Sequence, residues 1–386
     1  MPNGGDLQYP VTLIMGHTIG IDGRKLNDFG IGTYIRHLIQ GLTEIDRDNS
    51  YVLLLAPQDH LQFPDLPDNF KVVTERARPY GVRELVDLSW RLFRLKLDLY
   101  HSTHYVLPWV VPCKAVVTIH DIIHLLYPEF LPNSLAYFYA QRMIRRSLQR
   151  GDHILADSQN TKADLVEYFE VTGEKIKVVY PGVSERFRGE VDAAKEKNVL
   201  ESLGIEKPYI LFVGNPKPHK NLNGVVKAFA RSLAIRDFDA NLVCVGDRTG
   251  RDFKIRQRAE QLGIADRVHL VGHVSDDELP AIYQGADLFL YPTLYEGFGL
   301  PVVEAMASGV AVITSNTSAL KEVAEGYADL VNPLDIEEIA NAIAHCMGDR
   351  EHREALRKLG KRRAQDFSWR RTAELTREKY LQTLSP

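Results

Sequence analysis

Short apolar runs alternate with amphipathic stretches along the whole chain. Runs of Val, Ile and Leu bounded by polar residues are typical of buried parallel strands, whereas apolar residues spaced three and four apart are typical of helices. In the first half of the chain, the pattern predicts strands at 11–15, 51–55, 71–74, 99–105, 115–121, 153–156 and 175–180. Helices are predicted between them at 35–42, 83–97, 135–150 and 161–168.

The alternation stops at 184–207, where apolar residues become sparse and charges crowd together, as is typical of a linker. It restarts with predicted strands at 209–213, 241–245, 268–271, 286–291 and 310–314. Helices are predicted at 222–233, at 251–262, after Pro301 and at 336–347. Strands alternating with helices predict parallel sheets covered on both faces. We therefore expect an α/β protein with two doubly wound, Rossmann-like domains, 1–183 and 208–368, that face each other across a cleft.

Composition and charge set limits on function. The 386 residues are 45% hydrophobic and 25% charged, as in a soluble globular protein, and the net charge of −4 gives no general attraction to nucleic acid. Cys113, Cys244 and Cys346 lie far apart, which predicts no disulfide framework and suits a reducing compartment. Neither a signal peptide nor an apolar run long enough to span a membrane is predicted, so we expect a cytoplasmic protein.

The stretch 291–309, with the sequence YPTLYEGFGLPVVEAMASG, carries the strongest functional signal. A glycine-containing loop joins a predicted strand to a helix that starts near Pro301, a position where proline is tolerated. In doubly wound sheets, such a loop lies at the carboxyl edge of the strands, where ligands bind. Gly297 and Gly299 let backbone N–H groups approach a ligand, and the helix start favours an anion.

Glu296 and Glu304 make this stretch more specific, because a carboxylate beside a phosphate would be repelled. Each carboxylate is better matched to a pair of neighbouring hydroxyl groups. Hydroxyls on both sides of a phosphate describe a nucleotide sugar, with ribose on one side and a hexose on the other. The spacing alone leaves a plainer alternative open, a capped helix with two solvated glutamates.

Two further loops before helices repeat this theme. The loop 214–221 contains Gly214, Asn215, Lys217, His219 and Lys220, a combination of cations and free N–H groups that suits a diphosphate. It lacks the GxxxxGK[ST] spacing, and no GxGxxG occurs in either half, which disfavours nicotinamide chemistry. Gly30 and Gly32 precede the helix at 35–42, where a plain turn is the open alternative.

His120 follows the predicted strand at 115–121 and is a candidate general base at neutral pH. The alternative is a structural histidine bonded to a carbonyl group. A metal site is a third interpretation of the polar groups at these strand ends, but their pattern fixes no coordination geometry. The residues concerned are His101, His104, His120, Asp121 and His124.

The helices at 83–97 and 135–150 mix aromatic and basic residues, including Trp90, Phe93 and Arg94 in the first and Phe138 and Arg146 in the second. Such faces suit an anionic membrane surface. The commoner arrangement is a helix packed on a sheet with a solvated basic face, and both interpretations stay open.

Several motifs together resemble the retaining glycosyltransferases of family 4, which have the two-domain GT-B architecture. They run in family order and include 21–34, 118–121, 157–158, 213–221, 271–275, the stretch from Glu296 to Glu304, and 367–369. The sequence is most similar to bacterial mannosyltransferases that build O-antigen and related polysaccharides. The resemblance also implies that a C-terminal helix, 369–386, crosses back to complete the first domain.

The resemblance implies roles for the second domain in holding the donor. Glu304 would bind the ribose hydroxyls and Glu296 those of the donor sugar. Backbone groups near these glutamates would assist them, from Gly297, Phe298, Gly299, Leu300 and Pro301, while Lys220 would hold the diphosphate. The loop of Gly272, His273 and Val274 would lie near the base. His219 departs from the arginine that many relatives carry at this position, so it contributes less charge at neutral pH.

From the first domain, Gly30 and Gly32 would close over the phosphates, and His120 would lie between donor sugar and acceptor with Asp121 nearby. The predicted reaction is retaining transfer of a hexose, with mannose preferred over glucose, to an acceptor hydroxyl. We expect front-face attack without a metal or other cofactor, and a glycan or lipid-linked saccharide as acceptor at the inner face of the membrane. The alternatives are a nucleotide-sugar epimerase, a phosphorylase, or a nucleotide-sugar binding protein without turnover.

Overall fold

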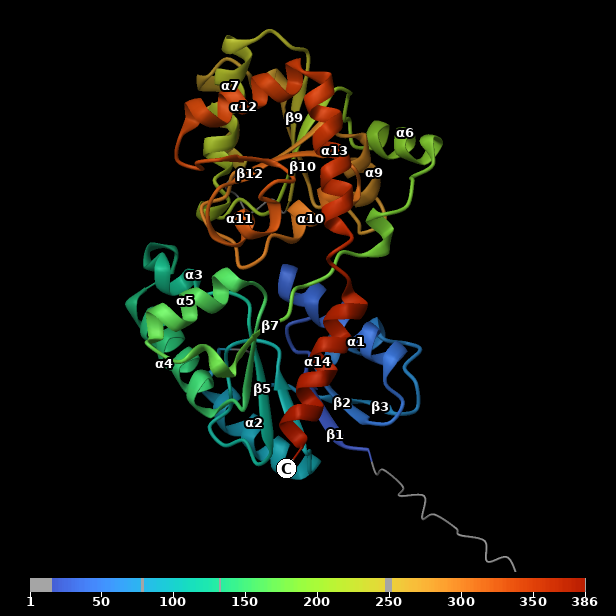
Figure 1. The fold of residues 1–386 in the computed structure, drawn as a ribbon, viewed down its shortest axis with the longest axis vertical. Helices are drawn as coiled ribbons and strands as arrows, with labels where there is room; N and C mark the ends of the chain where they lie inside the picture. The colour runs from blue at the N-terminus through green and yellow to red at the C-terminus, as the bar shows by residue number, and fades with distance from the viewer. Residues whose placement is uncertain (1–15, 78–79, 132, 247–251, 386) are drawn as a thin grey trace, which may run out of the picture.

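The computed structural model describes residues 16–77, 80–131, 133–246 and 252–385, which form two lobes stacked along the long axis of the molecule (Figure 1). Each lobe is built on one sheet in which all strands are parallel, seven in the order β3-β2-β1-β4-β5-β6-β7 and six in the order β10-β9-β8-β11-β12-β13. Both orders run outward in two directions from a central strand, as in doubly wound sheets. The structure confirms the predicted α/β class with two Rossmann-like domains.

The strands of the first lobe are β1 (Thr18–Asp22), β2 (Ser50–Leu55), β3 (Phe70–Thr74), β4 (Leu99–Ser102), β5 (Lys114–Ile119), β6 (His153–Ala156) and β7 (Ile176–Val178). Its helices are α1 (Phe29–Ile45), α2 (Val82–Leu95), α3 (Ile123–Leu126), α4 (Ser134–Arg150) and α5 (Gln159–Phe169). Alternate residues of β2 enter two separate cores, since Val52 and Leu54 pack on one face and Leu53 and Leu55 on the other. Burial on both faces explains why these strands are continuous apolar runs in the sequence.

The strands of the second lobe are β8 (Tyr209–Val213), β9 (Asn241–Val245), β10 (Val268–Gly272), β11 (Leu288–Tyr291), β12 (Ala311–Ser315) and β13 (Asp329–Val331). Its helices are α6 (Ala193–Ser202), α7 (Leu222–Ile235), α8 (Asp252–Gln261), α9 (Leu279–Gly285), α10 (Leu300–Ala307), α11 (Ser318–Ala324), α12 (Ile336–Gly348) and α13 (Arg350–Ala364). The segment expected to be a linker contains α6, whose Val199 and Leu200 enter the core of this lobe. Its charged residues lie on the exposed side of that helix, which made the segment look unstructured.

The beginning of the chain differs from expectation. The predicted strand 11–15 lies outside the described residues, and the first strand within them is β1, in a segment for which we predicted no strand. Its sequence, TIGID, has only two large apolar residues, so its pattern is weak although β1 lies at the centre of the sheet. Helix α1 begins at Phe29, and Gly30 and Gly32 therefore lie in its first turn rather than in a preceding loop.

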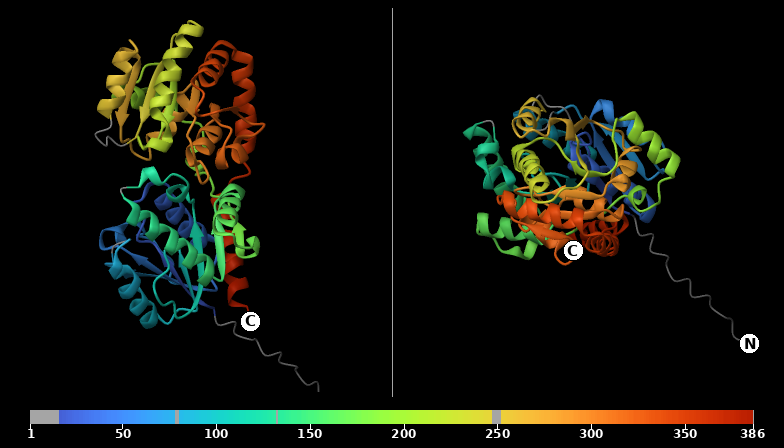
Figure 2. Two further views of the ribbon diagram at one scale, coloured as in Figure 1. Left: turned by 90° about the vertical axis from the view of Figure 1, so that its left-hand side faces the viewer. Right: turned by 90° about the horizontal axis from the view of Figure 1, so that it is seen from above.

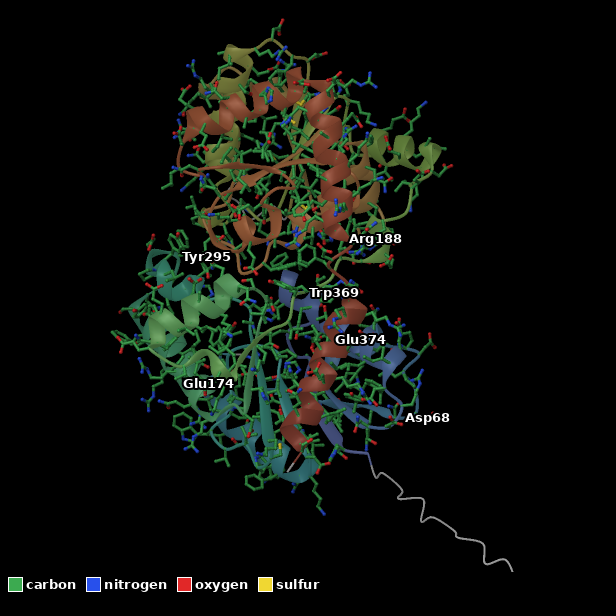
Figure 3. The ribbon with its side chains drawn as sticks, viewed as in Figure 1. Asp68, Glu174, Arg188, Tyr295, Trp369 and Glu374 are labelled. Atoms are coloured by element: carbon green, nitrogen blue, oxygen red, sulfur yellow. The ribbon has the colours of Figure 1, made fainter. Side chains whose placement is uncertain are left out.

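The chain crosses between the lobes twice, and the two crossings lie side by side. Val183 pairs with Ser368, and a Cβ atom on Gly182 would lie 2.1 Å from the backbone nitrogen of Trp369. After the second crossing, α14 (Trp369–Leu384) runs along the first lobe (Figure 2). Trp369 marks the start of this helix at the junction between the lobes (Figure 3).

Helix α14 is fixed to the first lobe by polar contacts as well as by packing. Arg377 Nε lies 2.8 Å from Asp46 Oδ2, and the hydroxyl of Tyr380 lies 2.6 Å from His101 Nδ1. The C-terminal helix thus belongs structurally to the first lobe although it follows the second in sequence.

Candidate functional site

The carboxyl ends of both sheets meet at the junction between the lobes. A Cβ atom on Gly297, in the loop after β11, would lie 2.1 Å from the carbonyl oxygen of His120, after β5. The hydroxyl of Thr161, on α5, lies 3.2 Å from the same oxygen and 3.2 Å from the carbonyl oxygen of Gly297. Only glycine permits this approach, so the loop that carries Glu296 touches the backbone of His120 directly.

Lys220 and Glu296 form the charged centre of the second lobe. Lys220 Nζ lies 2.7 and 2.9 Å from the two carboxylate oxygens of Glu296 and 2.9 Å from the hydroxyl of Tyr291. Burial disfavours the ammonium ion, but Glu296 and Tyr291 outweigh it and raise the pKa of Lys220 above its ordinary value. The lysine therefore stays charged at neutral pH.

A residue that the sequence analysis did not single out joins the two loops of this centre. Asn221 follows Lys220 with φ of 56°, and its side-chain amide donates to the carbonyl oxygens of Pro292 and Pro333 at 3.0 and 2.7 Å. Asparagine tolerates this left-handed conformation better than most residues. It fixes the lysine loop beside the loop that carries Glu296.

Glu304 lies in the first turns of α10, which begins after Gly299 with φ of 104°. The hydroxyl of Tyr283 donates to Glu304 Oε2 at 3.0 Å. Burial raises the pKa of Glu304 to about 7, and the hydrogen bond from Tyr283 and the charge of Arg186 only partly oppose this effect. The carboxyl group therefore changes its charge within the neutral range.

His120 has partners at both ring nitrogens. Nδ1 lies 2.7 Å from Asp157 Oδ2, and Nε2 lies 2.9 Å from the carbonyl oxygen of Thr103. Burial disfavours the imidazolium ion, but the hydrogen bonds to Asp157 and Thr103 and the charge of Asp157 outweigh burial and raise the pKa of His120. A ring that donates from both nitrogens to acceptors is the protonated form. This geometry favours a charged donor over the general base that we considered first.

The other first-lobe candidates have different surroundings. Asp121 accepts a hydrogen bond from the backbone nitrogen of Ile123 at 3.0 Å, which caps the start of α3. A Cβ atom on Gly30 would lie 3.8 Å from Leu300, so the N-terminus of α1 faces that of α10 across the junction (Figure 1). Gly32 instead packs within its own lobe. Its N–H donates to the backbone carbonyl oxygen of Asp28, and a Cβ atom would lie 2.0 Å from the carbonyl oxygen of Leu26.

In the loop 214–221, some of the predicted residues form backbone hydrogen bonds and others carry charge. The N–H of Gly214 donates to the carbonyl oxygen of Val245 at 2.8 Å, and the carbonyl oxygen of Asn215 accepts from Lys217 at 2.7 Å. The side chain of Lys217 is exposed. Burial, together with the charge of Lys220, lowers the pKa of His219 to about 4, so the ring is neutral. Lys220 is thus the half-buried cation of this loop.

The remaining donor-side candidates shape the backbone. Gly272 has φ of 90° and its carbonyl oxygen accepts from Gly246 at 2.9 Å, while Val274 is buried. The ring of Phe298 packs against those of Tyr180 and Phe367, with centroids 6.2 and 5.3 Å away. Leu300 and Pro301 form the first turn of α10.

Sequence reasoning missed the groups that hold these parts together. Asp157, Thr161 and Glu322 contact the site from segments far away along the chain. Arg186, in the segment expected to be a linker, forms an ion pair with Asp276 at 2.9 Å and influences Glu304. Asp157 belongs to one of the motifs that resemble the family, at the end of a strand, but no role was predicted for it; nothing in the local sequence around the other residues signals one.

Among the residues 16–77, 80–131, 133–246 and 252–385, no three His, Cys, Asp or Glu side chains are grouped so that they could hold a metal ion. None of the helices in these ranges combines the length and apolar character needed to cross a membrane.

Comparisons with known proteins identify the family of the chain. Residues 195–363 match the family model described as glycosyl transferases group 1, and residues 30–187 match that of glycosyltransferase family 4. The chain is 30% identical over 285 residues to O-antigen chain mannosyltransferase B of Escherichia coli, which covers 73% of each protein. It is 30% identical to the MMP alpha-(1->4)-mannosyltransferase of Mycolicibacterium hassiacum, over 90% of this chain and 93% of that one.

Other similarities concern a longer relative and the fold. The serotype-specific mannosyltransferase WbdA of Escherichia coli is 27% identical over 90% of this chain, which spans only 45% of that protein. The structure of Anabaena Alr3699/HepE in complex with UDP and glucose is similar with a TM-score of 0.77 and 18% identity, over 95% of this chain and 100% of that one.

Proposed function

Because the chain belongs to glycosyltransferase family 4, we propose that it transfers a hexose from a nucleoside-diphosphate sugar to an acceptor hydroxyl, with retention at the anomeric carbon. Mannose is the preferred sugar, because several relatives are named mannosyltransferases, and glucose is second. One observation carries the proposal: Glu296, which forms a half-buried ion pair with Lys220, lies on a loop that touches the backbone of His120.

The donor would be held by the second lobe. Lys220 is bonded to Glu296, and an entering diphosphate would give its ammonium group a second anionic partner. Glu296 would then accept from hydroxyl groups of the hexose. Within the part of the chain that the structure describes, the Glu304 carboxylate accepts one side-chain hydrogen bond, from Tyr283, so its second oxygen can accept from the ribose hydroxyls.

Retention would follow from attack on the face that the diphosphate leaves. Both glutamates have binding duties, so a covalent intermediate on a carboxylate is disfavoured. The departing phosphate oxygen would assist removal of the acceptor proton. Stabilisation of the developing diphosphate charge would come from Lys220 and from the N-termini of α10 and α1, without a metal or another cofactor.

The acceptor would bind on the first lobe, and buried polar groups support this. His104 is 1% exposed, and neither of its ring nitrogens has a hydrogen-bond partner within the described residues, the nearest carboxylate oxygen being that of Glu84 at 3.6 Å. The hydroxyl of Tyr139 also has no hydrogen-bond partner within the described residues. The centroid of the Tyr80 ring lies 6.0 Å from that of His104 and 6.5 Å from that of Tyr139. Saccharide hydroxyls would satisfy such groups.

We also propose that the first lobe contacts an anionic membrane, which would supply a lipid-linked acceptor. Trp90 and Phe93 of α2 are 55% and 58% exposed, and Trp109, in a loop bonded to α2, is 53% exposed. Arg94 lies over the Trp90 ring at 3.7 Å and Arg146 over the Trp109 ring at 5.2 Å. Aromatic rings beside arginines suit a headgroup interface. Replacing Trp90 and Trp109 by alanine should reduce sedimentation with phosphatidylglycerol vesicles, and unchanged binding would refute the contact.

A nucleotide-release assay with GDP-mannose and UDP-glucose tests the main proposal. Release that depends on an added saccharide acceptor, with an α-linked product, is the expected result. Consumption of the donor without an acceptor would indicate an epimerase, and a requirement for inorganic phosphate would indicate a phosphorylase. Tight nucleotide binding without turnover of either donor would indicate a binding protein.

A further inference from the structure

The carboxylate of Glu322 crosses from the second lobe to the first. Glu322 lies on α11, and its two oxygens accept hydrogen bonds from the backbone nitrogens of Gln159 and Asn160 at 2.9 and 3.0 Å. These are the first two residues of α5 in the other lobe (Figure 1). The hydroxyl of Tyr180 also donates to this carboxylate, at 2.6 Å.

The start of α5 is incomplete without this carboxylate. The first N–H groups of a helix have no partner within the helix. Ser158 accepts from the third residue, Thr161, and the N–H of Lys162 forms the first bond within the helix. Glu322 satisfies the remaining two, and its negative charge lies at the positive end of the helix dipole. A cap from the other lobe therefore ties the two lobes together.

Both ends of α11 take part in this tie. At the start of α11, the hydroxyl of Ser318 accepts from the N–H of Glu296 at 3.1 Å, and the N–H of Ala319 donates to the carbonyl oxygen of Glu296 at 3.4 Å. About one turn further on, Glu322 holds α5. One short helix thus fixes the backbone of the donor-side glutamate and the first lobe at the same time.

The tie continues through α5 to His120. Thr161 contacts the carbonyl oxygens of both His120 and Gly297, and Tyr295 donates to Asp164 one turn further along α5. Tyr295 is labelled between the two lobes in Figure 3. The contacts form a closed path from Glu296 through α11 and α5 to His120, with the carboxylate of Glu322 as its charged link.

We propose that Glu322 is a positioning residue that sets the spacing between His120 and the loop of Glu296 during glycosyl transfer. The inference rests on the proposed function. Three donors already occupy the carboxylate, so Glu322 acts through α5 rather than on the substrate. Misplacing groups by about 1 Å can reduce a rate about a hundredfold, which makes such spacing a determinant of kcat.

Replacement of Glu322 by alanine tests this, with Glu325→Ala as the matched control, an exposed glutamate at the end of the same helix. We expect Glu322→Ala to lower kcat about tenfold to a hundredfold, while the Kd for the nucleoside diphosphate stays within about twofold because Lys220 and Glu304 lie in the second lobe. Glu322→Gln keeps one acceptor oxygen and should lose less. Equal kcat values for Glu322→Ala and Glu325→Ala would overturn the proposal.

Two further measurements separate positioning from simple stabilisation. Thr161→Val removes another link of the same path, so the loss of kcat in the double variant should be smaller than the product of the single losses. Small-angle X-ray scattering of Glu322→Ala should show a larger radius of gyration than wild type, and an unchanged value would contradict the tie. If wild type turns over neither donor, the proposed function fails while the scattering result still decides whether Glu322 joins the lobes.

Discussion

The two lobes share one architecture but use their buried charges differently. In the first lobe, the guanidinium group of Arg24 donates to Asp22 at 2.8 and 2.5 Å, to Glu84 at 2.8 Å and to the carbonyl oxygen of Ala77 at 3.1 Å. In the second lobe, Glu304 accepts one side-chain hydrogen bond within the described residues, and Lys220 donates to Glu296 and to the hydroxyl of Tyr291. Both oxygens of Asp22 and of Glu84 accept hydrogen bonds within the first lobe, which suits a scaffold. Glu304 keeps an oxygen that can accept from a ligand.

The same contrast separates the groups near the junction. The second lobe presents a cation and two carboxylates, which suit phosphates and hydroxyls. The first lobe presents His120, which is held by Asp157 and Thr103. It also presents helix α5, whose Thr161 contacts Gly297 of the second lobe. We therefore assign recognition of the donor to the second lobe and alignment of the reacting groups mainly to the first. The following experiments would break or sharpen that division.

The largest effect is expected for Lys220→Ala, because it removes the half-buried cation beside the proposed diphosphate site. Loss of one preorganised donor to a developing charge costs about a hundredfold to a thousandfold in kcat. Lys217→Ala, in the same loop but exposed, is the matched control and should change kcat by less than about fivefold. Steady-state assays of nucleotide release would measure both. Equal losses in the two variants would place the charge stabilisation elsewhere.

A smaller loss is expected for Asp157→Asn, which removes the charge that favours protonated His120. In wild type, the raised pKa of His120 keeps its imidazole protonated when the pH exceeds the ordinary pKa of a histidine. With a neutral amide in place of the Asp157 carboxylate, His120 should lose its proton at a lower pH. We expect kcat to fall about tenfold at neutral pH, and the alkaline limb of its pH profile to move toward acid.

Asp68→Asn serves as the control, because Asp68 is exposed and lies far from the junction (Figure 3). Nucleotide affinity should be unchanged in both variants if the first lobe only aligns groups. A pH profile of Asp157→Asn that coincides with that of wild type would remove His120 protonation from the mechanism.

Next in size is the effect of Glu304→Gln on nucleotide affinity. Ribose hydroxyls donate more strongly to a carboxylate than to an amide, so the Kd should rise about tenfold above neutral pH. In wild type, the carboxyl group takes up a proton as the pH falls through about 7, and affinity should fall with it. Calorimetric titration across this range would show the dependence in wild type but not in the variant. A pH dependence that persists in Glu304→Gln would assign the titration to another group.

How far the sequence predicts the molecule follows the same division. Glu296, Glu304 and Lys220 lie in or beside single loops between a strand and a helix, so local pattern places them at the edge of the sheet. Thr161 reaches Gly297, and Glu322 reaches α5, only when the lobes pack, whereas Asp157 meets His120 within the first lobe, where β5 and β6 pair. No pattern within a single segment of the chain reports these contacts. The strand β1 was missed for a related reason: its central position in the sheet, rather than its weak apolar pattern, makes it a strand.

The smallest effect is expected from removal of divalent metal ions. Charge on the diphosphate would be met by Lys220, whose raised pKa keeps it protonated, and by the N-termini of α10 and α1. Excess chelator should therefore leave kcat within about twofold of its untreated value, since the proposed mechanism assigns no step to a metal as Lewis acid. Readdition of Mg²⁺ or Mn²⁺ to the treated enzyme provides the control. A loss of turnover that either ion restores would contradict the assignment, because the second lobe would then need a metal ion to neutralise the charge that we assign to Lys220.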